Sequence, residues 1–140
     1  MLNIPEMQEL RDLLSEVKTI AVVGLSPKEA RPSNMVARYL IEAGYTVIPV
    51  NPGQTTILER TCYSSLDEIP IAVDLVDIFR RSEEVYPIVE SAVKIGVKAV
   101  WMQQGIVNGE AADYARTQGL KVVMDRCIKI DHQSLLVEPS

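Results

Sequence analysis

The sequence contains few of the residues from which metal and nucleophilic sites are most often built. It has one histidine, His132, and two cysteines, Cys62 and Cys127, with no CxxC pair, so no metal site is expected. Two cysteines in 140 residues also exclude a disulfide scaffold. Because no export signal is recognised, we expect both thiols to be free in a reducing cytoplasm.

Long apolar runs and an excess of basic residues are also missing. No run approaches the roughly 18 apolar residues of a membrane span, and acidic residues stand where a secretory signal needs a basic start. We therefore expect a cytoplasmic protein that binds no membrane. The net charge of −5 argues against a nucleic-acid partner but does not exclude a small anionic ligand, for which only the local charge matters.

The rest of the composition is that of one globular domain. Hydrophobic residues make up 47% and charged residues 24% of the chain. A chain of this length buries roughly 68% of its unfolded surface on folding, which is enough for a core without disulfides. We expect residues 1–140 to form a single domain.

Five short apolar runs rich in β-branched residues recur at residues 19–23, 46–50, 74–78, 98–102 and 121–124. They lack the alternation of apolar and polar residues, which is typical of strands buried on both faces of a parallel sheet. Between them, amphipathic helices are predicted over residues 35–43, 85–95 and 110–118, each followed by glycine. Ser33 is the predicted N-cap of the first of these helices.

A further helix is predicted before the first run, where Met7, Leu10, Leu14 and Val17 recur at helical spacing. Residues 53–70 are irregular apart from a weak helical turn at 66–68, and His132 is assigned to a tail. Strands and helices alternating at this spacing predict a Rossmann-like α/β fold with an extra N-terminal helix. Its doubly wound five-stranded parallel sheet is expected in the order 3-2-1-4-5, flanked by helices.

In such sheets ligands bind beyond the carboxyl ends of the strands, so the residues after each run are the candidate site. The first run ends at Gly24, which permits a sharp turn toward a helix N-terminus that favours anions. The loop lacks the second and third glycines of GxGxxG, but it offers polar side chains in their place. Its candidate binding residues are Gly24, Ser26, Pro27, Lys28, Arg31, Pro32 and Ser33.

The other strand ends supply further candidates. After the second run, Val50, Asn51 and Pro52 stand where an NAD-binding domain carries an acid for the ribose hydroxyls, which counts against NAD. After the third run, Arg80 could clamp a phosphate beside Phe79, although an exposed arginine at a helix entry needs no ligand.

The last two strand ends add Gln103 and Gly105 after the fourth run and Asp125, Arg126 and Cys127 after the fifth. Asp125 and Arg126 could form a local salt bridge, and Trp101 is interpreted as a core residue. A buried, inert thiol is the expected state of Cys127.

Taken together, the motifs at the strand ends resemble the single-domain CoA-binding proteins of bacteria and archaea over roughly residues 17–132. These motifs are Gly24-x-Ser26-Pro27, Arg31-Pro32-Ser33, Val50-Asn51-Pro52, Phe79-Arg80, Trp101-x-Gln103-x-Gly105 and Met124-Asp125-Arg126-Cys127. The family is similar to the N-terminal domain of the succinyl-CoA synthetase alpha subunit. The resemblance implies binding of coenzyme A or an acyl-CoA, and it does not identify a protein partner.

The resemblance also implies which residues face which part of CoA. Residues 24–26 and 31–33 would hold the phosphates, residues 50–52 and 79–80 would line the adenosine, and residues 103–105 would face the pantetheine. The synthetase works through a phosphorylated histidine in a second domain. This chain has no matching histidine, so ligase activity is not implied.

Several functions remain open from the sequence. The first is a non-catalytic CoA-binding module, because no paired carboxylates and no Ser-His-Asp order are recognised. The second is an acyl-CoA-using enzyme subunit that works through Asp125, Cys127 or His132. The third is an NADP-binding or other nucleotide-binding domain, in which Arg80 takes the 2′-phosphate. A mixed disulfide between the CoA thiol and Cys62 or Cys127 is a further alternative.

Overall fold

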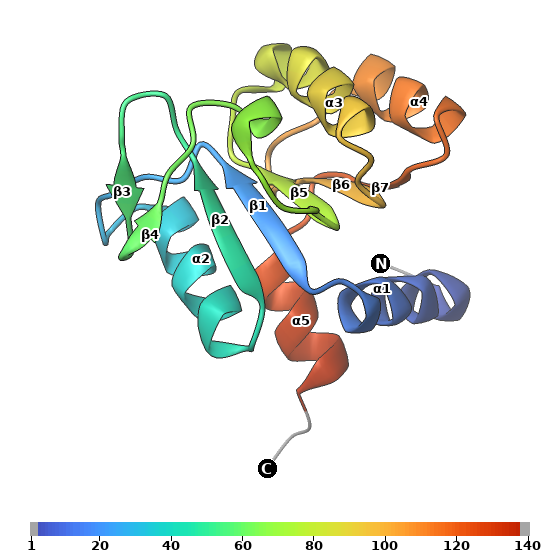
Figure 1. Ribbon diagram of the computed structural model, residues 1–140. Coiled ribbons are helices and arrows are strands. Elements are labelled where there is room, and N and C mark those ends of the chain that lie inside the picture. Colours follow the sequence, from blue (N-terminus) through green and yellow to red (C-terminus); the bar gives the residue numbers. More distant parts are fainter. Residues whose placement is uncertain (1–2, 138–140) are drawn as a thin grey trace.

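Five parallel strands form the centre of the molecule in the computed structural model, which describes residues 3–137 (Figure 1). The strands of this sheet are β1 (Thr19–Val23), β2 (Thr46–Val50), β5 (Leu75–Ile78), β6 (Ala99–Met102) and β7 (Lys121–Val123). The helices are α1 (Ile4–Glu16), α2 (Pro32–Glu42), α3 (Val85–Lys94), α4 (Gly109–Thr117) and α5 (Ile128–Leu136). The connections contain a hairpin of β3 (Thr56–Ile57) and β4 (Arg60–Thr61) and two short 3-10 helices, η1 (Leu66–Glu68) and η2 (Ser82–Glu84). The predicted Rossmann-like α/β fold is confirmed.

Each face of the sheet is covered by its own group of helices. Helices α1, α2 and α5 pack on one face, and α3 and α4 pack on the other (Figure 1). Successive residues of β1 therefore enter different cores, with Ile20 and Val22 in the first and Ala21 and Val23 in the second. This explains why the strands are apolar throughout. Within the described residues, no helix combines the length and apolar character needed to cross a membrane.

The predicted strand order is wrong. The five runs lie in the order second, first, third, fourth, fifth, because the chain leaves β2 and crosses to the far side of β1 to form β5. The outer edge of β2 is occupied at its end by Tyr63, whose N–H donates to the carbonyl of Pro49 at 3.0 Å. Proline has no N–H for a strand ladder and is tolerated at a sheet edge. Pro49 in the second run was therefore the signal that this strand lies at the edge.

The predicted helices are confirmed with bounds that differ by at most three residues. Helix α2 begins at Pro32, three residues earlier than expected, because proline is pre-organised for the first helical position. The prediction that Ser33 caps this helix is therefore wrong, since Arg31 occupies the N-cap. Asn3 and Asn108 cap α1 and α4 through their side-chain oxygens.

Helix α5 was missed, and the assignment of His132 to a tail is wrong. His132 lies within α5, where its Nδ1 is 2.6 Å from the hydroxyl of Tyr39 and its ring meets that of Tyr45 edge-on. Burial lowers the pKa of His132 below its ordinary value. The apolar spacing of Ile128 and Leu135 was the available signal, but the helix packs against α1 and α2, which lie far from it in the sequence.

Asp77 on β5 is a completely buried carboxyl group in the middle of the sheet. Neither of its side-chain oxygens has a hydrogen-bond partner among the described residues. Its strand neighbours are Val22 on β1 and Trp101 on β6. Burial therefore raises the pKa of Asp77 well above its usual value, since the charged form has lost its hydration without gaining a partner.

The buried carboxyl group of Asp77 should make the stability of the fold depend on pH. Because the folded-state pKa of Asp77 is raised above the unfolded value, the folded protein must keep this proton as the pH rises. Its free energy of unfolding should fall as the pH rises above about 4, the ordinary carboxyl range. Asp77→Asn should remove this component and exceed the wild type in stability at pH 7 by roughly 1–3 kcal/mol.

Urea unfolding between pH 4 and pH 8 measures this difference. The control is Asp67→Asn, which changes an exposed carboxylate in η1 and should leave the pH profile unaltered. Parallel profiles for the wild type and Asp77→Asn would contradict the prediction.

Candidate functional site

The carboxyl ends of β1 and β5 form a topological switch point, because the chain leaves these neighbouring strands toward opposite sides of the sheet. Gly24 follows β1 with a φ of +86° and donates its N–H to the carbonyl of Val50 at 2.9 Å. A Cβ at Gly24 would lie 2.3 Å from the carbonyl oxygen of Phe79, which follows β5. Glycine is therefore required here for close approach of the two strand ends as well as for the turn.

The loop after Gly24 is held from inside by polar side chains. The Ser33 hydroxyl accepts from the N–H of Ser26 at 2.9 Å, and Asn34 Nδ2 donates to the Ser26 carbonyl at 2.9 Å. Asn51 Nδ2 donates to the carbonyl of Leu25 at 3.0 Å. Ser33 and Asn51, both candidates from the sequence, therefore have their polar atoms engaged in fixing the loop.

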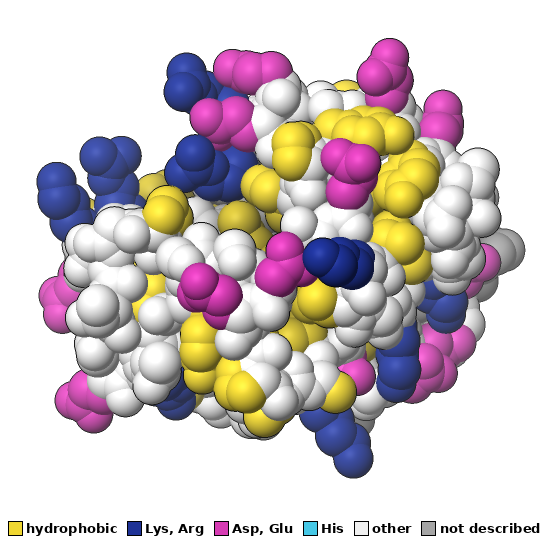
Figure 2. All heavy atoms as spheres, turned by 45° about the horizontal axis from the view of Figure 1, so that its top comes forward, with side chains coloured by type: hydrophobic (Ala, Val, Ile, Leu, Met, Phe, Trp, Pro, Cys, Tyr) yellow, Lys and Arg dark blue, Asp and Glu magenta, His cyan; other side chains and the backbone are white. Residues whose placement is uncertain are grey.

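The charged candidates of this loop point outward instead. Lys28 and Arg31 are exposed, between the exposed prolines Pro27 and Pro32. Neither cation has an ion-pair partner within residues 3–137. Figure 2, which looks onto this end of the molecule, shows Lys and Arg side chains gathered beside a hollow that exposes hydrophobic side chains. An acidic protein thus has a locally basic edge.

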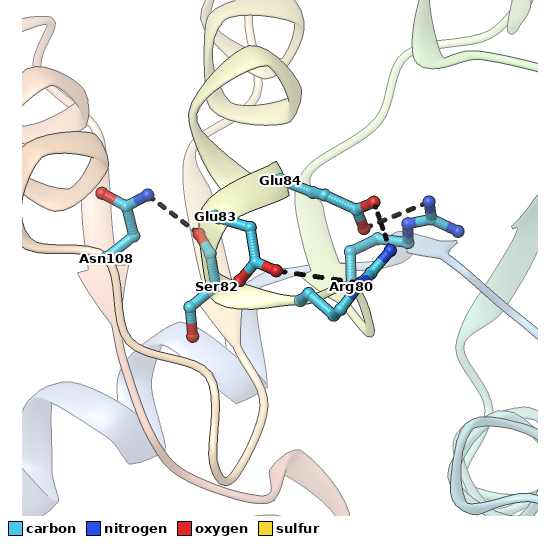
Figure 3. A network of polar contacts seen from close by, with 6 residues as sticks. Arg80, Ser82, Glu83, Glu84 and Asn108 are labelled. Atoms are coloured by element: carbon cyan, nitrogen blue, oxygen red, sulfur yellow. Dashed lines mark hydrogen bonds and ion pairs between the residues drawn. The ribbon is translucent and has the colours of Figure 1, made fainter.

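Arg80 stands beside Gly24 at the switch point and is held by an ion pair. Its guanidinium lies 3.1 Å from the carboxylate of Glu84, one turn along the chain (Figure 3). Arg81 reaches the same carboxylate at 3.4 Å and Glu83 at 3.9 Å. The Arg80 side chain remains 43% exposed, so Glu84 orients a cation that a stronger anion can still reach.

Ser82 and Asn108 fix the segment that carries these charges. Asn108 Nδ2 donates to the Ser82 carbonyl at 2.9 Å, and the Ser82 hydroxyl accepts from the N–H of Val107 at 3.0 Å. The same Asn108 caps α4 through its side-chain oxygen, so the starts of α3 and α4 are tied together (Figure 3).

Two cavities open on either side of Arg80. The first cavity, of about 480 Å³, lies toward β2 and is lined by Gly24, Val50, Pro52, Arg80 and a segment near η1. The second cavity, of about 700 Å³, lies toward β6 and α5 and is lined by Pro32, Phe79, Arg80, Gln103, Gly105 and Cys127, among others. Arg80 and Glu83 belong to both cavities.

The structure therefore brings together only part of the predicted set. Eight of the predicted residues line the two cavities: Gly24, Val50, Pro52, Pro32, Phe79, Arg80, Gln103 and Gly105. The other six do not line them: Ser26, Pro27, Lys28, Arg31, Ser33 and Asn51. Sequence reasoning missed Ser64, Ser65 and Leu66, because the crossover that brings them to the first cavity has no regular spacing.

The fifth strand end differs from the sequence interpretation. Arg126 does not pair with Asp125, because its guanidinium binds both carboxylate oxygens of Asp131 at 2.7 Å. Asp125 instead accepts the N–H of Gly105 at 2.7 Å. Trp101 is confirmed as a core residue, fully buried with its Nε1 donating to the Arg126 carbonyl. Both cysteines are free, as expected, but Cys127 is partly exposed rather than buried.

Comparison with known proteins decides the family. The sequence model of the family described as "CoA binding domain" matches residues 18–133. The chain belongs to this CoA-binding domain family. The match begins just before β1 and ends within α5, so it includes every strand end described above.

Relatives of this CoA-binding domain fall into two kinds. An uncharacterised Bacillus subtilis protein, YneT, is 41% identical over 91% of this chain and 95% of its own length. A solved structure of a hypothetical protein from Pyrococcus horikoshii is 42% identical, covers 93% of this chain and 92% of its own, and superposes with a TM-score of 0.91. An ADP-forming acetate–CoA ligase of Archaeoglobus fulgidus is 30% identical over 79% of this chain but only 18% of the ligase.

The contact between Gly24 and Phe79 predicts a specific cost of substitution. Gly24→Ala should destabilise the fold by about 1–3 kcal/mol more than Gly119→Ala, as measured by urea unfolding. Gly119 is the matched control, because its φ is +87° and no atom lies within 4 Å of a Cβ built there. In both variants an alanine must adopt a positive φ, but only in Gly24→Ala does the new Cβ also overlap the Phe79 carbonyl. Equal losses would show that the contact does not constrain the fold.

Proposed function

We propose that this protein binds coenzyme A or an acyl-CoA along the carboxyl ends of its strands, as a binding module without catalysis. The observation that carries the proposal is the position of Arg80, half-exposed between two cavities at the switch point. In CoA a pyrophosphate joins the 3′-phosphoadenosine to the pantetheine arm. A cation flanked by a cavity on each side fits that shape.

The phosphates are the part of CoA for which the edge provides charge. Arg80 lies at the point where the backbones of β1 and β5 meet, and Lys28 and Arg31 extend over the neighbouring loop. The N-terminus of α2 directs its positive dipole end to the same edge. A phosphate that reaches Arg80 would take the place of the Glu84 carboxylate as the partner of the guanidinium. It would be the stronger partner, because it is a doubly charged acceptor.

The two cavities suit the two arms of the ligand. The first cavity is lined by Val50 and Pro52 and would take the adenosine, while the second contains Gln103 and Gly105 and would take the pantetheine. Asn51 stands where an acid would hold a ribose diol, and its amide is engaged with Leu25 and Gly53. This arrangement favours CoA, which needs no such acid, over NAD.

The ligase relatives support CoA binding and no more. The aligned region is 18% of the acetate–CoA ligase, so the activity of that enzyme belongs to a much longer chain. We therefore propose the binding step alone for this chain.

Charge reversal tests the role of the basic edge. Arg31→Glu and Arg80→Glu should each weaken CoA binding at least about tenfold, or about 1.4 kcal/mol, because each replaces a phosphate-facing cation with a repelling charge. Isothermal titration calorimetry measures the dissociation constant. Arg116→Glu is the control, since Arg116 is exposed near the end of α4, just before β7 begins and away from the carboxyl ends of the strands. Unchanged affinity in both edge variants would overturn the proposed placement.

A ligand comparison separates CoA from the NADP alternative. At equal concentration, CoA should raise the midpoint of thermal unfolding more than NADP or NAD does, because a ligand stabilises the fold according to its affinity for the native state. Differential scanning fluorimetry provides the midpoints. A larger shift with NADP would favour the dinucleotide function in place of the one proposed.

A further inference from the structure

Cys127 lies immediately before α5, and its side chain lines the second cavity together with Phe79, Arg80 and Gly105. The thiol is free and partly exposed. If the phosphates bind at Arg80 and the pantetheine extends past Gly105, the sulfur end of CoA reaches the part of the cavity that Cys127 lines. We propose that Cys127 exchanges with CoA disulfide to form a mixed disulfide with CoA. This inference rests on the proposed function.

Gln103 is a second feature that points to a ligand in the same cavity. Its side chain is only 4% exposed, and its Oε1 accepts the N–H of Ile128 at 3.1 Å. This bond fixes the orientation of the amide, while Nε2 has no acceptor among the described residues and stays within reach of solvent at the cavity that Gln103 lines. An amide N–H that is open to the cavity can donate to an amide carbonyl of the pantetheine arm.

The exchange balances without any oxidant other than the CoA disulfide. The thiolate sulfur of Cys127 attacks one sulfur of the disulfide bond, and the bond between that sulfur and the second CoA breaks. A new bond joins Cys127 Sγ to the first CoA, and the second CoA leaves as a thiolate that takes a proton from water. Cys127 is oxidised, and one CoA is reduced to its thiol.

The surroundings of Cys127 favour this exchange over acyl transfer. Transfer of an acyl group to a thiol generally uses a neighbouring base. The described residues that line the second cavity include no histidine, and their one carboxylate, Glu83, lies 3.9 Å from the Arg81 guanidinium. Disulfide exchange requires an accessible sulfur and no such neighbouring base.

Cys62 provides an internal comparison within the same chain. It is 8% exposed, lines neither cavity, and its Sγ lies 3.5 Å from the carbonyl oxygen of Asn51. Burial raises the pKa of the Cys62 thiol, which lowers its thiolate fraction. We therefore expect Cys127 to react with CoA disulfide faster than Cys62 does.

The experiment incubates the full chain with CoA disulfide or with glutathione disulfide at pH 8 and follows adduct formation by intact-mass spectrometry. One CoA moiety should be added to the wild type and to Cys62→Ser, and none to Cys127→Ser. The rate with CoA disulfide should exceed that with glutathione disulfide at least about tenfold, because binding raises the local concentration of the reagent. Arg80→Glu should remove this preference, whereas Arg116→Glu, on α4 away from the carboxyl ends of the strands, should retain it.

Isothermal titration with reduced CoA separates this inference from the proposed function. If Cys127→Ser binds CoA and the wild type gains no adduct, the mixed disulfide is overturned and CoA binding stands. Equal rates with both disulfides would also overturn it, since Cys127 would then be an ordinary accessible thiol. Absence of CoA binding to the wild type would overturn the proposed function together with the inference that rests on it.

Discussion

The contact between the ends of β1 and β5 is the constraint on which the candidate site depends. A side chain at Gly24 would overlap the Phe79 carbonyl, and the N–H of Phe79 donates to the carbonyl of Val23 at 2.8 Å. The two strand ends are thus fixed against each other by both sterics and hydrogen bonding. Arg80 follows directly, so its place between the cavities is set by the sheet rather than by a mobile loop.

Local periodicity was enough to predict the strands, most helices and the fold class. The strand order depends instead on where a long irregular crossover leads, and no residue spacing within 51–74 specifies that path. Pro49 was the one local signal, because a strand that lacks an N–H belongs at an edge. The order matters for function, since it puts the switch point between β1 and β5 and brings Gly24 beside Arg80.

Gly24 and Arg80, which the sequence named for a turn and for a charge, line the cavities, whereas the short polar side chains could act in two ways. Asn51 and Ser33 have the residue types of ligand contacts, yet their amide and hydroxyl groups hold the loop after β1. A short polar side chain beside a turn finds backbone partners easily. The Arg80 guanidinium also has an internal partner, Glu84, but it stays 43% exposed and open to both cavities.

The part of the second cavity that Cys127 lines is placed by α5, the helix missed from the sequence, because Cys127 is its N-cap. Arg126 reaches the 4%-exposed Asp131 within the first turn of α5, and this hydrogen bonding raises the pKa of Arg126. Ile128 is bound to Gln103, so the start of α5 is fastened to the end of β6. A ligand in this cavity therefore contacts residues whose positions depend on a helix far along the chain. For that reason the basic edge was recognisable from sequence, while the wall that carries Cys127 required the fold.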